Sequence, residues 1–385
     1  MCKVLVIFSL LFSTLTFAEM IGEFIVDKRH FFNTGVYDQQ KAHSSFTFSP
    51  EVFLENSEGI FHFKGKLRKD NEDSERNLID IQELYIINIL DEREIKYGIS
   101  KEFWGVTETT HRVDVINQTD YTEAFDGEEK LGQPMIKISY ERKWGLLDIY
   151  ALFGFRERNF YGDKGRLRLP ISISEKGVIY SSSSKNKRTD FAIRWSNYFD
   201  NLDIAISHFS GTSREPIFLP SHEKINALIP RYDVIDQTGL EIQYLIDSLA
   251  IKAELISRSG QGDRFSAATY GFEYTQVGIF ESRTDLGWVV ELNHDDRLES
   301  SPYVLGTRLS FNDVDDSQIL SGFIVNNKSK EIGFLLETSR RVGECCLLSV
   351  EGIYFDDRDE DNGQQKLFQA IQKDDFIRAE LIYYF

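Results

Sequence analysis

The sequence predicts an all-β protein, a single transmembrane antiparallel β-barrel of about 16 to 18 strands with long outer loops and short periplasmic turns. Three observations lead to this fold class. The last nine residues, 377–385, alternate strictly, and one face carries only apolar side chains. Segments of about ten residues with the same period recur along the chain, and the breaks between them are alternately short and long. Seven prolines against 30 phenylalanines and 17 tyrosines suit one large β body.

The N-terminal residues 1–18 have the pattern of a secretory signal peptide. Lys3 precedes an apolar run over residues 4–12, and the small-residue pattern Thr16-Phe17-Ala18 follows, so we expect cleavage after Ala18. No later segment approaches the roughly 20 apolar residues that a membrane-spanning helix needs. The sequence therefore predicts an exported chain whose residues 19–385 form the barrel.

The strands are predicted from period-two alternation, and their sum is 18, with 16 as the alternative. An even count returns both ends of the barrel to the same side of the membrane. The predicted strands are 23–31, 45–54, 60–67, 78–89, 95–103, 135–142, 146–155, 191–199, 202–209, 240–246, 250–256, 268–277, 286–293, 305–311, 319–325, 332–338, 347–355 and 377–385.

The breaks between these segments differ in length. Short ones fall at 56–59, 143–145, 200–201 and 341–343, where turn-forming residues gather. Long ones fall at 68–77, 105–134, 159–188, 211–237, 295–302 and 356–375. This alternation is typical of a barrel that has tight turns at one end and long loops at the other.

The two faces of the strands differ in polarity. Apolar side chains predicted to face lipid include Phe191, Ile193, Trp195, Ile251, Ala253, Leu255, Tyr270, Phe272, Tyr274, Trp288, Val290 and Leu292. The opposite face carries charges of both signs: Asp190, Arg194, Lys252, Glu254, Glu273, Glu291, Arg308, Glu337, Glu351, Arg378 and Glu380. Unpaired buried charges are costly, so these side chains indicate a wet lumen. A barrel of this size is wide enough for an aqueous channel.

The formal net charge of −18 makes nucleic acid a poor partner, because binding phosphates needs a clustered basic field. Beyond the predicted signal peptide only Cys345 and Cys346 remain. As neighbours on a strand they would point to opposite faces, and we expect them to be buried and not to form a disulfide with each other.

Two segments resemble known proteins. The closing segment, with Tyr383 and the terminal Phe385, resembles the last strand of bacterial outer-membrane β-barrels. That resemblance implies recognition of the tail by the barrel-assembly machinery. Trp104-Gly105, with His111, Asp114, Asn117 and Asp120, resembles a motif of poorly characterised porin-like outer-membrane proteins of proteobacteria. It covers about a third of the chain and implies a channel-like barrel, but it assigns no solute.

The long loop at 101–134 is the densest group of candidate functional residues. It has few apolar anchors, and two arrangements stay open: folded into the lumen, where it narrows the pore, or exposed at the surface. The following loop is basic. If the two loops face each other across the channel, their opposite charges would orient polar solutes; alternatively, the basic side chains bind lipopolysaccharide phosphates or keep the loop soluble. The predicted constriction comprises Trp104, Glu108, His111, Arg112, Asp114, Asp120, Glu123, Arg156, Arg158, Arg166 and Arg168.

Other chemistries have weaker support. His208 and Ser210 have the His-x-Ser spacing of outer-membrane phospholipases, but Gly211-Thr212 follows where that family has Asn-Gly, and no third orienting residue is identifiable. Asp357, Asp359 and Asp361 suggest calcium, yet Asn362 and Phe368 occupy the positions that a calcium loop gives to Gly and Glu. We therefore expect no catalytic residues, no metal and no cofactor.

The sequence thus favours an outer-membrane channel for passive diffusion of small hydrophilic solutes. Its expected partners are outer-membrane lipid and lipopolysaccharide, the barrel-assembly machinery and small polar solutes; the sequence leaves open a homo-oligomer. A barrel enzyme acting on lipid through His208 and Ser210, and a structural or adhesion barrel with a plugged lumen, are the alternatives.

Overall fold

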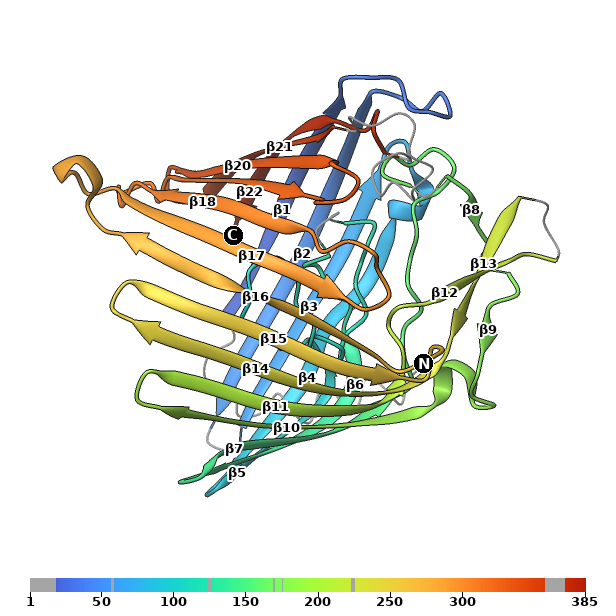
Figure 1. Cartoon of the computed structure of the whole chain (residues 1–385), viewed down its shortest axis with the longest axis vertical. Coiled ribbons are helices and arrows are strands. Elements are labelled where there is room, and N and C mark those ends of the chain that lie inside the picture. Colours follow the sequence, from blue (N-terminus) through green and yellow to red (C-terminus); the bar gives the residue numbers. More distant parts are fainter. Residues whose placement is uncertain are drawn as a thin grey trace.

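The structure is a closed antiparallel β-barrel of 18 strands with almost no helix (Figure 1). It is a computed structural model and describes residues 19–56, 59–123, 127–168, 170–174, 176–222, 226–356 and 371–385. The predicted signal peptide and the acidic segment with Asp357, Asp359 and Asp361 lie outside the described residues. Within the described part, no helix is both long and apolar enough to cross a membrane.

The barrel strands follow one another in chain order. Each pairs with the next, and β22 pairs with β1 to close the sheet. Their bounds are β1 Glu19–Phe31, β2 Ala42–Asn56, β3 Gly59–Asp70, β4 Leu78–Leu90, β5 Arg93–Ser100, β6 Gln133–Arg142, β7 Gly145–Phe153, β10 Thr189–Phe199, β11 Leu202–Thr212, β14 Val234–Ile246, β15 Leu249–Ser259, β16 Phe265–Gln276, β17 Asp285–Asp295, β18 Tyr303–Ser310, β19 Gln318–Val325, β20 Ile332–Val342, β21 Cys346–Asp356 and β22 Phe376–Tyr384.

The predicted fold class is confirmed, and the strand number is 18, not 16. Each predicted strand overlaps one barrel strand. The turns between β2 and β3, β6 and β7, and β10 and β11 lie at one end, and the long connections at 101–132, 154–188 and 213–233 lie at the other, which we call the loop end.

The prediction missed four short strands in the loops. They are β8 Ser172–Ile173, β9 Ile179–Tyr180, β12 Ile217–Pro220 and β13 Ala227–Tyr232. Strand β13 pairs antiparallel with β12 and parallel with β8 and β9, so a small sheet joins two loops beside the barrel (Figure 1). Strands β8 and β9 have two residues each and carry no readable period, and β12 and β13 each contain a proline, which interrupts a strand pattern. Three short 3₁₀ turns complete the described elements: η1 Ser74–Arg76, η2 Lys185–Lys187 and η3 Ile279–Glu281.

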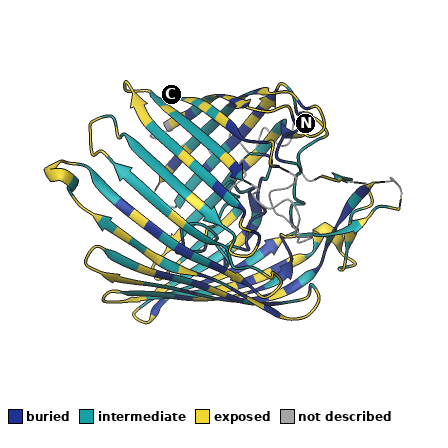
Figure 2. Cartoon of the chain, turned by 45° about the horizontal axis from the view of Figure 1, so that its top comes forward, coloured by how far each residue is buried: buried dark blue, intermediate teal, exposed yellow. Residues whose placement is uncertain are grey.

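The predicted sorting of faces agrees with the exposure of the side chains. Phe191 is 58% exposed, whereas its neighbour Asp190 is fully buried. Leu255 is 42% exposed and Glu254 is fully buried. Alternation of exposed with buried or half-buried residues runs along the strands (Figure 2). The apolar side chains therefore cover the outside of the barrel, and the charged ones point inward.

The prediction of two buried cysteines was wrong. Cys345 is exposed and Cys346 is half-buried, because they lie where the turn 343–345 leads from β20 into β21, beyond the packed part of the barrel. Both are free thiols, and their Sγ atoms are 3.2 Å apart.

Candidate functional site

The described residues of the connection between β5 and β6, 101–123 and 127–132, lie against the inner faces of several strands, and we call them the inner segment. Glu254 on β15 accepts hydrogen bonds from the backbone N–H groups of Val106 at 2.8 Å, Thr107 at 3.0 Å and Val113 at 3.2 Å, and from the Thr107 hydroxyl at 2.7 Å. A carboxylate that would otherwise be buried without partners is thus satisfied by backbone donors.

Glu291 on β17 forms a second anchor of the same kind. It accepts hydrogen bonds from the N–H groups of Glu108 at 2.7 Å and Thr109 at 2.9 Å, and from the Thr109 hydroxyl at 2.6 Å. Arg112 extends this contact, because its guanidinium lies 3.3 Å from Asp295 and donates to Thr269 at 3.2 Å. The inner segment is therefore held on the inward faces of β15, β16 and β17.

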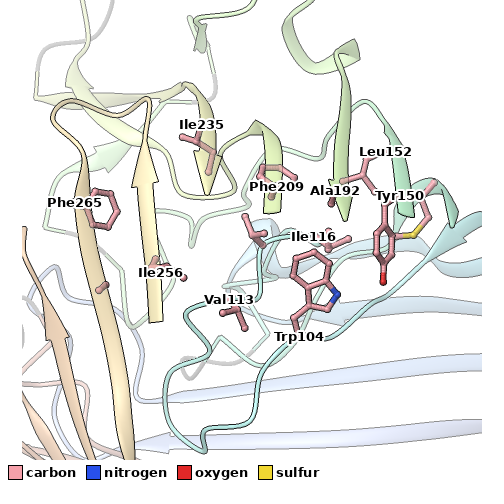
Figure 3. Close-up of a cluster of buried hydrophobic side chains, with 13 residues drawn as sticks. Trp104, Val113, Ile116, Tyr150, Leu152, Ala192, Phe209, Ile235, Ile256 and Phe265 are labelled. Atoms are coloured by element: carbon pink, nitrogen blue, oxygen red, sulfur yellow. The ribbon is translucent and has the colours of Figure 1, made fainter. Parts of the chain in front are cut away.

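An apolar cluster also holds the inner segment against the wall (Figure 3). Trp104, Val113 and Ile116 are at most 2% exposed and belong to one cluster with Tyr150 of β7 and Phe209 of β11. The rings of Trp104 and Tyr150 meet edge to face with centroids 5.7 Å apart. Trp104 was predicted to line the pore, but it is a packing residue, because the segment presses its few apolar side chains onto the wall.

The predicted acidic residues of the segment are held in ion pairs. Asp114 lies 3.0 Å from Lys130, and burial raises the pKa of its carboxyl despite that ammonium group. Asp120 is 1% exposed and accepts a hydrogen bond from Thr122 at 2.8 Å. Burial raises the pKa of the Asp120 carboxyl, but the Arg68 guanidinium and the hydrogen bonds from Asn159 and Thr122 together outweigh burial and lower it. Glu123 contacts Arg68, and these residues therefore join the segment to β3.

The predicted basic residues of the next loop are also paired. Arg156 donates to both oxygens of Asp80 on β4, at 2.8 and 3.0 Å. Arg158 lies over the ring of Tyr121 in the inner segment, at 4.4 Å from its centroid, and donates to the backbone oxygen of Arg214. The two loops are thus in contact, with cationic and polar groups matched at short range.

Arg166 and Arg168 lie farther along the same loop. Arg166 is 2% exposed; its Nε donates to Asp374 at 2.7 Å, and its guanidinium lies over the ring of Phe31. Arg168 contacts Asp163 at 3.4 Å. Arg166 therefore fastens this loop to the segment that precedes β22, and its buried side chain does not face an open passage.

The acidity of His111 is strongly changed by its surroundings. Burial opposes its charge, but hydrogen bonds and charge interactions with Glu128 and Glu254 outweigh burial and raise its pKa to about 10. Its Nε2 lies 3.2 Å from Glu128 and its Nδ1 lies 3.6 Å from Glu254. The imidazole is therefore a cation at neutral pH.

A cavity of about 580 Å³ separates the inner segment from the wall formed by β17 to β21. Of the predicted residues, Glu108 and His111 line it; Glu108 also pairs with Lys252 at 2.5 Å and with Arg308 at 3.6 Å. Arg308, Glu337 and Glu351 line the opposite side. The alternation in the sequence predicted that these three residues face inward but did not assign them to the site. Only the register between neighbouring strands brings them together.

A second cavity, of about 710 Å³, lies near the end of the barrel that carries the turns. Val106 of the inner segment reaches it, and Arg194 and Glu241, which form a two-pronged pair at 2.8 and 2.9 Å, line its wall. Polar, charge-lined space is therefore present on two sides of the inner segment.

His208 and Ser210 lie on β11 and do not contact each other through any described hydrogen bond. His208 is exposed on the outward face, and its Nδ1 lies 3.0 Å from the Thr238 hydroxyl. Among the described residues, no group of three or more His, Cys, Asp or Glu side chains is arranged to hold a metal ion.

The closing residues are tied to β1. The backbone N–H of Gly22 donates to the carbonyl of Phe385 at 3.0 Å, and the N–H of Phe385 donates back at 3.1 Å. The Phe385 ring lies 5.0 Å from that of Phe24, and Tyr383 is 44% exposed on the outer face. The terminal aromatic therefore belongs to the aromatic surface at the seam of the barrel.

Comparison with known proteins gives the fold and no family. No protein-family model and no curated protein matches the sequence. Among solved structures, a BenF-like porin from Pseudomonas fluorescens Pf-5 superposes with a TM-score of 0.56 at 10% identity, over 96% of this chain and 98% of that one. OpdQ of Pseudomonas aeruginosa superposes with a TM-score of 0.54 at 10% identity, over 96% and 97%.

The chain has a porin-like barrel fold. The carbohydrate-binding outer-membrane β-barrel Wzi, involved in group 1 capsule assembly in Escherichia coli, has the same architecture, with a TM-score of 0.55 at 10% identity over 95% of this chain and 84% of that one. The porin-like barrel therefore serves more than one role among these neighbours, and the role of this chain has to be argued from its lumen.

Proposed function

We propose that this porin-like barrel is a channel in the bacterial outer membrane through which small hydrophilic solutes diffuse passively. The observation that carries the proposal is the position of the inner segment. It contacts the inner wall from β3 to β17 and leaves, among the described residues, a cavity of about 580 Å³ against β17 to β21, lined by apolar side chains and by charges of both signs. A lumen that is partly filled and keeps a gap with charged groups at its edge is an arrangement that suits a size-selective pore.

The constriction would lie between Glu108 and His111 on the segment and Arg308, Glu337 and Glu351 on the wall. Both signs of charge face the gap, so a polar solute would exchange water for charged and hydrogen-bonding groups on entry. In this proposal the charges at the gap take the place of the electric field that the sequence predicted between the two long loops. Most of the charges of those loops are paired with the wall or with each other. The passage carries no catalytic group and no cofactor in this proposal.

The surroundings follow from the same proposal. Residues 1–18 would direct export and be removed, and the apolar outer face would lie in outer-membrane lipid beside lipopolysaccharide. The closing residues with Tyr383 and Phe385 would be recognised by the barrel-assembly machinery. No nucleic acid partner is expected for so acidic a chain. Whether the barrel associates with copies of itself is a matter for measurement.

The test is the conductance of the purified, folded barrel in a planar bilayer, with liposome swelling in a size series from monosaccharide to trisaccharide. We expect steady conductance, and uptake that falls steeply with solute size. Arg308→Ala, which shortens a side chain at the gap, should speed uptake of the larger sugars. Ile193→Ala, on the lipid face, is the control and should leave uptake unchanged. A folded barrel that passes neither ions nor sugars would support the plugged structural or adhesion role instead.

The role of His208 and Ser210 is tested separately. We propose that both are structural, because His208 contacts Thr238 and faces outward. Ser210→Ala should then leave both solute uptake and phospholipid turnover unchanged. A selective loss of lipid hydrolysis by this variant would favour the alternative of a barrel enzyme acting on lipid.

A further inference from the structure

The inner wall opposite the inner segment has an order that the proposed channel does not by itself require. The pairing of β18 to β22 places inward residues in rows across the strands. The row nearest the loop end contains Val304, Ile324, Gly333 and Phe355. The next contains Gly306, Gly322, Leu335, Ile353 and Phe376. Two adjacent rows of the inner face are therefore apolar or lack a side chain.

The third row changes character abruptly. It runs Arg308, Leu320, Glu337, Glu351 and Arg378. The cavity of about 580 Å³ extends over the two apolar rows and reaches Arg308, Glu337 and Glu351 of the charged row. Its size is in the range of cavities that hold small molecules, and such cavities are mostly apolar with a few polar groups. One wall of this lumen is therefore amphipathic along the direction of passage.

The apolar part is continuous with a packed cluster. Phe355 and Phe376 are at most 5% exposed and pack with Phe31 and Leu167, and Ile324 and Ile353 lie against that cluster. Four of the six apolar side chains of the two rows are thus held by packing against one another or against this cluster, and a ligand would meet a partly preformed surface. A purely hydrophilic sugar would gain nothing from such a surface, whereas an apolar body would leave water on contact with it.

Among the described residues, carboxylates outnumber cations at the Glu337 and Glu351 end of the charged row, away from Arg308. A smaller cavity of about 210 Å³ at this end is lined by Glu337, Ser349, Glu351, Arg378 and Glu380, with three carboxylates and one guanidinium. That guanidinium is shared, because Arg378 contacts Asp27, Glu351 and Glu380. A cationic group would be stabilised at this position, and an anionic one would be repelled.

We propose that the cavity is a binding site for a small amphipathic cation, with its apolar body on Leu335 and Ile353 and its cationic head beside Glu337 and Glu351. This deepens the proposed function, on which it rests for the role of the bound solute, by naming a class of solute that the channel would favour. Binding itself requires only the cavity.

The test uses calorimetric titration of the detergent-solubilised barrel with 2-phenylethylammonium. Two matched compounds separate body from head: 2-phenylacetate has the same ring with an anionic head, and methylammonium has the head without the ring. We expect binding of 2-phenylethylammonium at least tenfold tighter than that of either compound. Equal or tighter binding of 2-phenylacetate would overturn the charge assignment, and equal binding of methylammonium would overturn the apolar wall.

Variants locate the site on the wall. Leu335→Ala with Ile353→Ala should weaken binding at least tenfold, because each lost methylene in contact with an apolar body changes affinity by about fourfold, and the loss of two such contacts already gives about sixteenfold. Glu337→Gln should weaken binding of the ammonium compound and not that of the acetate. Leu336→Ala, the next residue on β20 but facing lipid at 38% exposure, is the control and should bind like the parent. Heat-modifiable migration on a gel verifies that each variant is folded.

The binding experiment and the conductance experiment test the cation site and the channel separately. A barrel that conducts ions while binding none of the three compounds would overturn this inference and leave the channel intact. A barrel that binds 2-phenylethylammonium, and loses that binding in the Leu335→Ala, Ile353→Ala variant, but passes no ions would overturn the channel and support the site.

Discussion

Replacing Glu254 by Gln should release the inner segment without opening the barrel. Oε1 of Glu254 accepts three hydrogen bonds, from Val106, Thr107 and the Thr107 hydroxyl, and Oε2 accepts one from Val113. A glutamine that keeps its oxygen at the first position turns three charge-assisted bonds into neutral ones, each weaker by about 1 kcal/mol. Its NH₂ group would face the Val113 N–H, and this opposed pair of donors costs about 2 kcal/mol more.

This loss of about 5 kcal/mol destabilises the bound position of the inner segment. The barrel itself is not weakened, because the hydrogen bonds that pair β15 with its neighbours do not involve the Glu254 side chain. Backbone amides of the segment should therefore exchange with solvent roughly four-thousandfold faster, since each 1.4 kcal/mol is a factor of ten. Hydrogen exchange read by mass spectrometry on peptides covering 104–116 measures this. In a bilayer, the same variant should show larger and noisier conductance.

Glu273→Gln is the matched control for Glu254→Gln. Glu273 also faces the lumen, but it lies on β16 and pairs with Lys252 at 3.0 Å, not with the inner segment. Its exchange pattern over 104–116 should match that of the parent. Unchanged protection in Glu254→Gln, with the control behaving as stated, would refute the idea that this carboxylate anchors the segment.

Three further predictions concern other contacts. The pKa of His111 is raised to about 10. The stabilisation of the folded state by the charged imidazole is therefore complete below about pH 6.5 and is lost as the pH rises through 10. Amide hydrogen exchange of the inner segment should accelerate over this pH window in the parent and not in His111→Gln. Arg166→Met should lower the free energy of unfolding by about 3 kcal/mol in denaturant titrations, because it leaves Asp374 buried without its cation; adding Asp374→Leu should recover part of the loss, and no recovery would contradict the pairing. Deleting Phe385 should reduce the yield of heat-modifiable barrel in cells, because the hydrogen bonds to Gly22 and the contact with Phe24 are lost; a normal yield would count against a role of the tail in assembly.

The local period of the chain was enough to predict the barrel. A strand between lipid and water must alternate, and residues 377–385 and the other segments do so without a competing helical period. The same alternation placed Phe191 and Leu255 outside and Asp190 and Glu254 inside, because side-chain direction on a strand depends only on parity. The number of strands was predicted by counting the alternating segments along the sequence.

The content of the lumen could not be read from the sequence. Parity shows that Glu254 points inward, but only the closed barrel brings it to Val106, 148 positions away along the chain. For the same reason the loops' charges could be counted but not paired: Arg156 faces Asp80, and Arg166 faces Asp374, across 208 positions. Loops have no period that fixes their path, so their contacts depend on which strands the closed sheet places opposite them.

The amphipathic wall shows the same division between sequence and tertiary structure. Alternation alone determined that Leu335, Glu337, Glu351 and Ile353 face inward. Their arrangement in rows, apolar beside apolar and charge beside charge, depends on the register of β20 against β21. A shift of register by two residues would keep every side chain on its face but would mix the rows, because it would move Leu335 from Ile353 to the level of a glutamate. The sequence determined the barrel and its faces, and the register and the path of the inner segment decided where the cavity lies.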